Sequence, residues 1–266
     1  MFLTGKQLRK VRLVTGAYIG IGAVAVFSFL MFLILGSFEL PLLIIGILCL
    51  AFSYPVYKIT KFSAGKGKLI NSGNNLIYRQ LWPEEFINLY NEARNDPENV
   101  YSVPDFDVLR LLLTAYSALG DKENELKIVD ELYSFAPAEK KSLAKLCKCS
   151  VLYGCGRTEE AEEIIKQIQS EKLDMMSKSF LDLLLNTDRA MALGDYNAAE
   201  LCYRQKLQTK FPKLTPLVLV VFHFEIAEIC YKTDRVEEAK EHYMYCVENG
   251  GRTIYKTKAE EMLSRL

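Results

Sequence analysis

Histidine is scarce in this 266-residue chain, which contains only His223 and His242. The Gly-x-Ser-x-Gly, His-Glu-x-x-His and dinucleotide-binding motifs are absent as well. His223 lies in an apolar stretch, where a packed core histidine is commoner than a general base, and we expect His242 to be solvated. The sequence therefore predicts no catalytic residue, no cofactor and no metal site, and we expect that the protein is not an enzyme.

Charged side chains are missing from two neighbouring runs, residues 14–35 and 40–57. A helix of 22 residues is about 33 Å long, enough to cross the hydrocarbon core of a bilayer. We predict a transmembrane hairpin over residues 1–60, with helices at about 13–35 and 40–57. A cleaved signal peptide fits less well, because the first run is long and a second follows at once. The small residues Gly16 and Gly20 suit packing within the hairpin or, alternatively, dimerisation.

Basic residues flank the two apolar runs only on their outer sides. By the positive-inside rule, the N-terminus and the C-terminal domain then both lie in the cytoplasm. We expect a multi-pass protein of a bacterial inner membrane, on the overall character of the sequence. The flanking basic residues are Lys6, Arg9, Lys10 and Arg12 before the runs, and Lys58, Lys61, Lys66 and Lys68 after them.

The formal net charge of zero conceals two opposed parts. Residues 1–68 contain eight Lys or Arg and one acid, whereas residues 69–266 contain 25 basic and 32 acidic side chains. An acidic domain disfavours binding to phosphate backbones, so we expect no nucleic-acid partner. Seven cysteines without a regular framework indicate free thiols in a reducing compartment. Cys147 and Cys149 match no common zinc spacing, although neighbouring lysines would favour a reactive thiolate.

The remaining sequence divides into a spacer and a helical domain. Glycine, serine and asparagine are dense over residues 61–75, which predicts a flexible or turn-rich juxtamembrane linker. Beyond it, apolar residues recur every three or four positions and no segment alternates as a strand does. The sequence thus predicts an all-α fold, in which residues 76–266 form a cytoplasmic domain.

Four helix breaks recur at similar intervals in this domain. They fall at Gly120, Gly156, Gly194 and Asp234, which are 36, 38 and 40 residues apart. Each break separates an apolar helix from a short amphipathic one. Periods of this size are typical of stacked helix pairs, in which each unit buries its apolar face against its neighbours.

The pattern around these breaks resembles the tetratricopeptide repeat family over roughly residues 105–249. The third unit matches best, with Gly194, Tyr196, Ala199, Tyr203 and, one position late, Pro212. The first unit departs from the pattern, since Glu125 stands where a small residue belongs, and the spacings exceed the family's usual 34 residues. The other matching positions are Tyr116, Gly120, Pro137, Gly156, Ala161, Ile165, Ala227, Ala239 and Tyr243.

The resemblance implies an α-solenoid whose concave face, lined by the first helix of each pair, binds a partner. That face would be apolar and aromatic with a few acids, which suits a peptide of some basic character. The alternative is that several of these positions are core or plain surface. The positions that the resemblance assigns to partner binding are Arg110, Thr114, Tyr153, Asp188, Phe224, Glu228 and Tyr231, with Ser117 and Ser150 also facing the groove.

These features predict a membrane-anchored adaptor or scaffold that binds a protein or peptide at the cytoplasmic face. One alternative is an accessory subunit of a larger membrane complex, such as a transporter, a protease or a secretion machine. A membrane enzyme with an unrecognised site is a further alternative.

Overall fold

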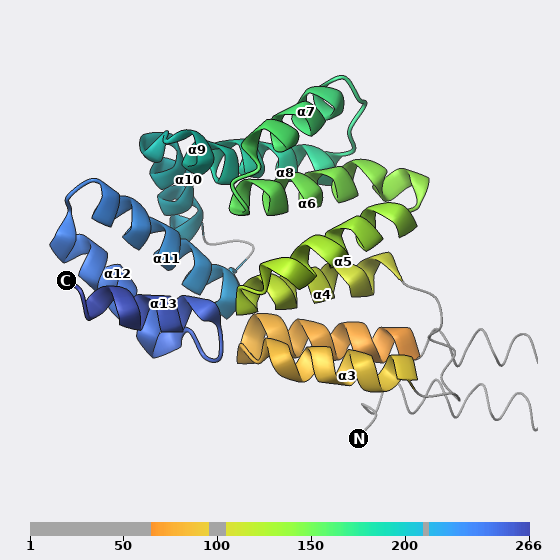
Figure 1. Cartoon of the computed structure of the whole chain (residues 1–266), viewed down its shortest axis with the longest axis horizontal. Helices are drawn as coiled ribbons and strands as arrows, with labels where there is room; N and C mark the ends of the chain where they lie inside the picture. The colour runs from red at the N-terminus through yellow and green to blue at the C-terminus, as the bar shows by residue number, and fades with distance from the viewer. Residues whose placement is uncertain (1–64, 96–104, 210–212) are drawn as a thin grey trace, which may run out of the picture. The chain divides into compact units, whose positions relative to one another are not determined.

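The computed structural model describes residues 65–95, 105–209 and 213–266 (Figure 1). The chain forms two compact units: Met1–Leu69 with Ala93–Val103, and Ile70–Glu92 with Pro104–Leu266. The account below concerns the second unit. The predicted transmembrane hairpin lies outside the described residues. Within the ranges given above, no helix has both the length and the apolar character needed to cross a bilayer.

The described residues are helical and contain no strand, which confirms the all-α prediction for this part of the chain. Most helices begin and end at the signals that the sequence carries. Asp105, for example, accepts backbone hydrogen bonds from Asp107 at 3.0 Å and Val108 at 3.4 Å, as an N-cap does. In chain order the elements are η1 (Leu76–Gln80), α3 (Pro83–Asn95), α4 (Phe106–Leu119), α5 (Lys122–Phe135), η2 (Ala138–Lys140), α6 (Lys141–Gly154), α7 (Thr158–Gln169), α8 (Met175–Asn186), α9 (Asp188–Leu193), α10 (Tyr196–Gln208), α11 (Pro216–Lys232), α12 (Val236–Asn249) and α13 (Ile254–Leu263).

The segment predicted to be a turn-rich spacer is helical over residues 65–75 and continues into the π-helical turn η1. One of its glycines, Gly73, serves close packing. A Cβ added at Gly73 would lie 2.7 Å from Phe86 Cε2 and 2.9 Å from Leu111 Cδ1. Ile77, one turn further on, is fully buried. The sequence signal was misleading because glycine marks close helix contacts as well as turns.

All four predicted helix breaks are confirmed by the backbone. Gly120, Gly156 and Gly194 have φ of 71°, 73° and 78°, and Asp234 has φ of 58°. This left-handed conformation ends a helix and reverses the chain, and it favours glycine because a Cβ is crowded there. The breaks thus separate α4 from α5, α6 from α7, α9 from α10 and α11 from α12.

Small residues lie where the two helices of a pair touch. Ala161, Ala199 and Ala239 are all 0% exposed, as the repeat pattern predicts. At the corresponding place in the first pair, Glu125 is also buried, and Lys122 Nζ donates to its carboxylate at 2.8 Å. The buried acid is therefore accommodated by an ion pair within its own helix.

The first helix of the third pair is interrupted at Thr187. This residue has φ of −124° and ψ of −89°, and its hydroxyl donates to the Leu183 carbonyl at 2.7 Å. A hydroxyl that bonds back to the carbonyl four residues earlier bends a helix. The interruption separates α8 from α9 and places Asp188 at the first position of α9.

The two ends of the helix stack meet within the second unit (Figure 1). Helix α13 contacts α4, and η1 contacts both α4 and α11. The Arg252 amide donates to the Leu81 carbonyl at 3.0 Å, and the Arg252 guanidinium lies 4.9 Å from the centre of the Trp82 ring. The family resemblance implies a superhelix with an exposed concave face, whereas here the helices close into a ring.

Candidate functional site

Two of the residues predicted to bind a partner lie in the core. Tyr153 and Phe224 are buried, and the Tyr153 hydroxyl donates to Glu162 at 2.7 Å. The Phe224 ring meets the Tyr243 and Tyr255 rings edge-on, with centroids 6.0 and 5.4 Å apart. As placed, both aromatic rings hold helices together and are covered by their neighbours.

The other predicted positions differ in accessibility. Arg110 is exposed on α4, and Tyr231 is 41% exposed at the end of α11. The Thr114 hydroxyl donates to the Arg110 carbonyl at 3.0 Å and lies 3.3 Å from the Tyr78 hydroxyl. Glu228 accepts from the Tyr243 hydroxyl at 2.7 Å. Arg110 and Tyr231 are thus the two that present most surface to a partner, and their role stays a prediction.

Asp188, at the first position of α9, lies against α6. It accepts hydrogen bonds from the hydroxyls of Ser150 and Thr187, the latter at 3.2 Å. Burial raises the pKa of Asp188. Burial also raises the pKa of Glu225 to about 7, and the negative charges of Asp188 and Glu228 act in the same direction. Two acids from α9 and α11 therefore influence each other electrostatically.

The pKa of Tyr255, in α13, is shifted by some of the same acids. Burial raises the pKa of Tyr255, and the charges of Glu225, Glu125 and Asp188 raise it further. These three acids belong to α11, α5 and α9, which are far apart in the chain. The charges of these three acids thus act in the same direction on one phenol. Glu225 carries a signal that sequence reasoning missed, because it is an acid within the apolar run of α11.

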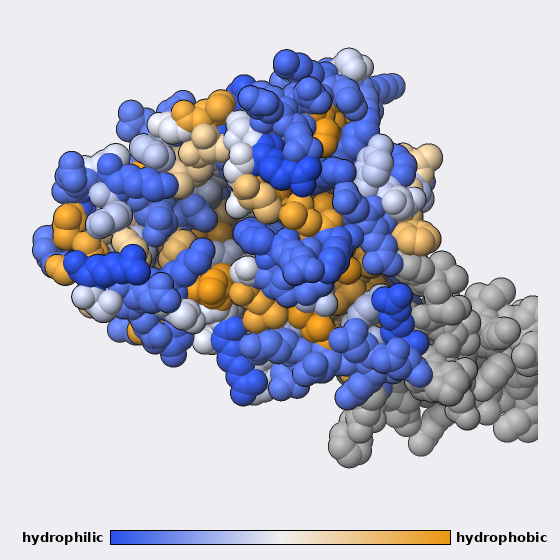
Figure 2. All heavy atoms as spheres, in the orientation of Figure 1, coloured by the Kyte–Doolittle hydropathy of each residue, from blue (hydrophilic) through white to orange (hydrophobic). Residues whose placement is uncertain are grey.

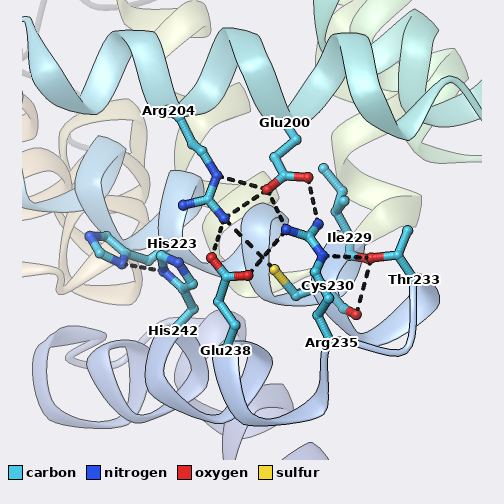
Figure 3. A network of polar contacts seen from close by, with 9 residues as sticks. All are labelled: Glu200, Arg204, His223, Ile229, Cys230, Thr233, Arg235, Glu238 and His242. Carbon is cyan, nitrogen blue, oxygen red and sulfur yellow. Dashed lines mark hydrogen bonds and ion pairs between the residues drawn. The ribbon is translucent and has the colours of Figure 1, made fainter.

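A second polar cluster joins α10, α11 and α12 (Figure 3). Arg235 donates to both carboxylate oxygens of Glu200, at 2.8 and 2.5 Å, and to Glu238 at 3.1 Å. Arg204 donates to Glu200 at 2.7 Å and also reaches Glu238. Figure 3 shows the two guanidinium groups lying between the two carboxylates. Two cations thus neutralise two anions contributed by α10 and α12.

Three groups of this cluster have the proximity of metal ligands. The ligand atoms of Glu200, Cys230 and Glu238 all lie within 4.8 Å of one another. Both carboxylates already pair with arginines, however, so a cation would have to displace two guanidinium groups. Burial, followed by the charge of Glu238, raises the pKa of the Cys230 thiol to about 11, and a protonated thiol is a poor ligand. The donor set fits an ion-pair network better than a metal centre.

The two histidines bind each other. Their Nδ1 atoms are 2.8 Å apart, so one ring donates and the other accepts (Figure 3). His223 also stacks on Tyr245, with ring centroids 3.8 Å apart. Burial, with the charge of His242, lowers the pKa of His223 to about 4. His223 has partners, as expected, but it is half-buried and not part of the core. His242 is also half-buried and not simply solvated, because it pairs with His223.

The cysteines of α6 are unreactive in this setting. Burial raises the pKa of Cys147 to about 11 and that of Cys149 to about 12. The neighbouring Lys145 and Lys148 donate to Glu171 at 2.5 Å and to Asp130 at 2.7 Å. Because both lysines pair with acids and both thiols are buried, the protonated form of each thiol is favoured.

Comparison of the chain with protein-family models finds no match, and comparisons with curated proteins and with solved structures find none either. The resemblance to tetratricopeptide repeats thus rests on the residues and helix breaks given above. It remains a prediction.

Proposed function

We propose that this protein is a membrane-anchored helical-repeat adaptor that binds a protein or peptide partner at the cytoplasmic face of a membrane. The observation that carries the proposal is the recurrence of left-handed helix breaks at Gly120, Gly156, Gly194 and Asp234. Breaks of this kind, 36 to 40 residues apart, produce stacked helix pairs. Proteins built of stacked helix pairs commonly bind a partner on the surface that the stack exposes.

The N-terminal sequence supports the membrane anchor. Residues 14–35 and 40–57 contain no charged side chain, and residues 1–68 have a net charge of +7. Basic residues beside a membrane are attracted to anionic lipids by about 1 kcal/mol each. An adaptor held in this way raises the effective concentration of its partner near the membrane.

Arg110 and Tyr231 are the predicted contact residues whose accessibility best supports partner binding. Both are exposed, on α4 and α11 respectively. Arginine and tyrosine are over-represented among residues that dominate binding free energy, because they combine large contact area with hydrogen bonding. These two side chains are therefore the ones to test.

The test is crosslinked affinity purification of the full-length protein from its own membranes. The wild type is compared with an Arg110→Ala/Tyr231→Ala variant and with a matched control, Lys127→Ala/Met244→Ala, at two other exposed positions. We expect a stoichiometric partner with the wild type and the control, and at least tenfold less of it with the first variant. Circular dichroism establishes that each variant is folded.

The absence of a stoichiometric partner from all three samples would contradict the adaptor function. Migration of the wild type only within one discrete large assembly in mild detergent would instead favour the accessory-subunit alternative. Equal capture of the partner by both double variants would show that Arg110 and Tyr231 are not part of the binding surface.

A further inference from the structure

The histidine pair between α11 and α12 has no part in the proposed function. His223 and His242 are the only histidines of the chain, and their Nδ1 atoms lie 2.8 Å apart. Figure 3 shows the two rings reaching toward each other from neighbouring helices. The ring of Tyr245 stacks on His223, with centroids 3.8 Å apart. The two imidazoles thus form a direct contact between α11 and α12.

This contact lies about one helical turn from the fully buried part of the same interface. Val220 precedes His223 by three residues and Cys246 follows His242 by four, and both are 0% exposed. The Cys246 thiol donates to the Val220 carbonyl at 3.5 Å. The histidines themselves are half-buried, so they lie at the edge of the interface. Separation of the two rings would therefore loosen the packing of α12 on α11 from that edge.

The protonation state of the pair decides whether its hydrogen bond can exist. With both rings neutral, one Nδ1–H donates to the lone pair of the other Nδ1. A first proton can bind Nε2 of the donor ring, which keeps the N–H···N bond and strengthens it by adding a charge. A second proton has to bind Nδ1 of the acceptor ring. Two N–H groups would then point at each other across 2.8 Å, so the hydrogen bond is lost and two positive charges repel.

The charges around His242 do little to offset this repulsion. Burial lowers the pKa of His242, and the positive charge of Arg204 on α10 lowers it further. Glu238 and Glu241 of α12 and Glu200 of α10 act in the opposite direction. Glu200 and Glu238 already accept from arginine side chains, which leaves the exposed Glu241. None of these four charges comes from η1 or α13, which also pack on α11.

The surroundings of His223 oppose its protonation as well. Burial is the larger cause and the charge of His242 the second, and together they lower the pKa of His223 to about 4. Burial raises the pKa of Tyr245, so the stacked phenol is uncharged in acid and offers no counter-charge. Both imidazoles are therefore neutral at pH 7, and the second proton binds only in acid.

We propose that the His223–His242 pair is a pH-sensitive switch between α11 and α12, closed while the two rings share a hydrogen bond and open once both are protonated. The switch concerns the packing of two helices, so it does not depend on the identity of a partner or on the membrane anchor. It adds a conformational response to acid on α11, the helix that also carries Tyr231.

Amide hydrogen–deuterium exchange of the full-length protein in detergent, at pH 7 and at pH 5, tests the switch. Each rate is divided by the intrinsic rate at the same pH, so that the protection of the amides is compared. His223→Gln and His242→Gln each leave a side chain that forms hydrogen bonds but takes up no proton. Glu237→Gln is the matched control, because it alters an α12 side chain that is 86% exposed and leaves the pair intact.

We expect the protection of α12, and of α11 around His223, to fall at least tenfold from pH 7 to pH 5 in the wild type and in the control. A ring with a pKa of about 4 in the closed state and the ordinary 6.5 in the open state favours opening about 20-fold more at pH 5 than at pH 7. Either histidine variant should lose at most threefold. The carboxylic acids titrate alike in all four proteins, so the comparison isolates the histidines.

Retention of the tenfold loss by His242→Gln would overturn the switch, because burial of His223 alone would then explain the sensitivity to acid. Equal protection of the wild type at the two pH values would overturn it as well. Imidazole NMR titration of the wild type tests the pair without any variant, so it holds even if a glutamine variant fails to fold. The two rings should titrate in two separate steps, and two coincident titrations near pH 6.5 would contradict the shared hydrogen bond.

Discussion

Glu225 shows how the fold alters the chemistry of a single residue. Its pKa is about 7 in the folded protein, against an ordinary value of 4.5, with burial as the largest cause and the charges of Asp188 and Glu228 adding to it. Lys232 and Lys258 oppose the shift. The folded state therefore binds the Glu225 proton more tightly than the unfolded chain does. Protonation must then stabilise the fold.

This linkage predicts a pH-dependent stability. The stabilisation from protonated Glu225 is complete below about pH 4.5 and is lost as the pH rises to about 7, with a total of roughly 3 kcal/mol. Glu225→Gln should remove this component, so that the variant gains stability relative to the wild type between pH 5 and 7.5. Urea unfolding of both proteins at these two pH values measures the difference. Glu237→Gln, at a side chain that is 86% exposed on α12, is the control, and its stability relative to the wild type should be the same at both pH values. The same result for Glu225→Gln would contradict the raised pKa of Glu225.

At the scale of the helices, the left-handed breaks determine where the chain reverses. Two of them, at Gly120 and Gly156, can be compared directly because they differ in the space around the glycine. A Cβ added at Gly156 meets nothing within 4 Å, whereas one at Gly120 would lie 2.9 Å from Ile254 Cγ1. Both glycines have positive φ, so both positions share the conformational cost. Only at Gly120 would an alanine also clash with a neighbouring side chain, that of Ile254.

We therefore predict that Gly156→Ala lowers the free energy of unfolding by about 1 kcal/mol, the cost of a left-handed residue with a Cβ. Gly120→Ala should lower it by about 1–3 kcal/mol more, because overpacking against α13 is added. Asp234→Gly should raise the free energy of unfolding by about 0.5–1 kcal/mol, because glycine adopts the left-handed conformation without the strain of a Cβ. Urea midpoints compare the three variants with the wild type. Equal effects of the two alanines would show that the Gly120–Ile254 contact is unimportant.

The helix pairs could be predicted from sequence because their signals are local. A glycine at the end of an apolar helix, such as Gly194, has one favoured role, and Ala199 five residues later fits the contact between two helices. Gly73 was misleading because a glycine in a helix contact and a glycine in a turn look alike. The interruption at Thr187 was equally hidden, since threonines within uninterrupted helices are common.

The mutual influence of Asp188, Glu225 and Tyr255 depends on contacts that no local pattern encodes. Asp188 is among the predicted groove residues, whereas Glu225 and Tyr255 come from α11 and α13, which pack on each other. The closing contact itself joins Leu81 to Arg252, which are separated by most of the helical domain. The sequence does show that Glu225 is an acid within the apolar run of α11. It does not show which side chains of other helices lie near Glu225.

At the scale of the whole second unit, closure of the ring couples its first and last helices. Ile254 of α13 packs against Gly120 at the end of α4, and Arg252 binds Leu81 beside η1. In a linear stack of repeats, a helix depends only on its sequence neighbours, so damage to the last helix stays local. In a closed ring, the same damage reaches helices at the other end of the chain.

Ile254→Asp tests this difference. Burying a charge against α4 should open the α13–α4 contact, so amides of α13, α4 and η1 are expected to exchange with deuterium at least tenfold faster, while α7 keeps its protection. Met244→Asp, at a position 49% exposed on α12, is the control and should change little. Faster exchange confined to α12 and α13 would indicate a linear stack.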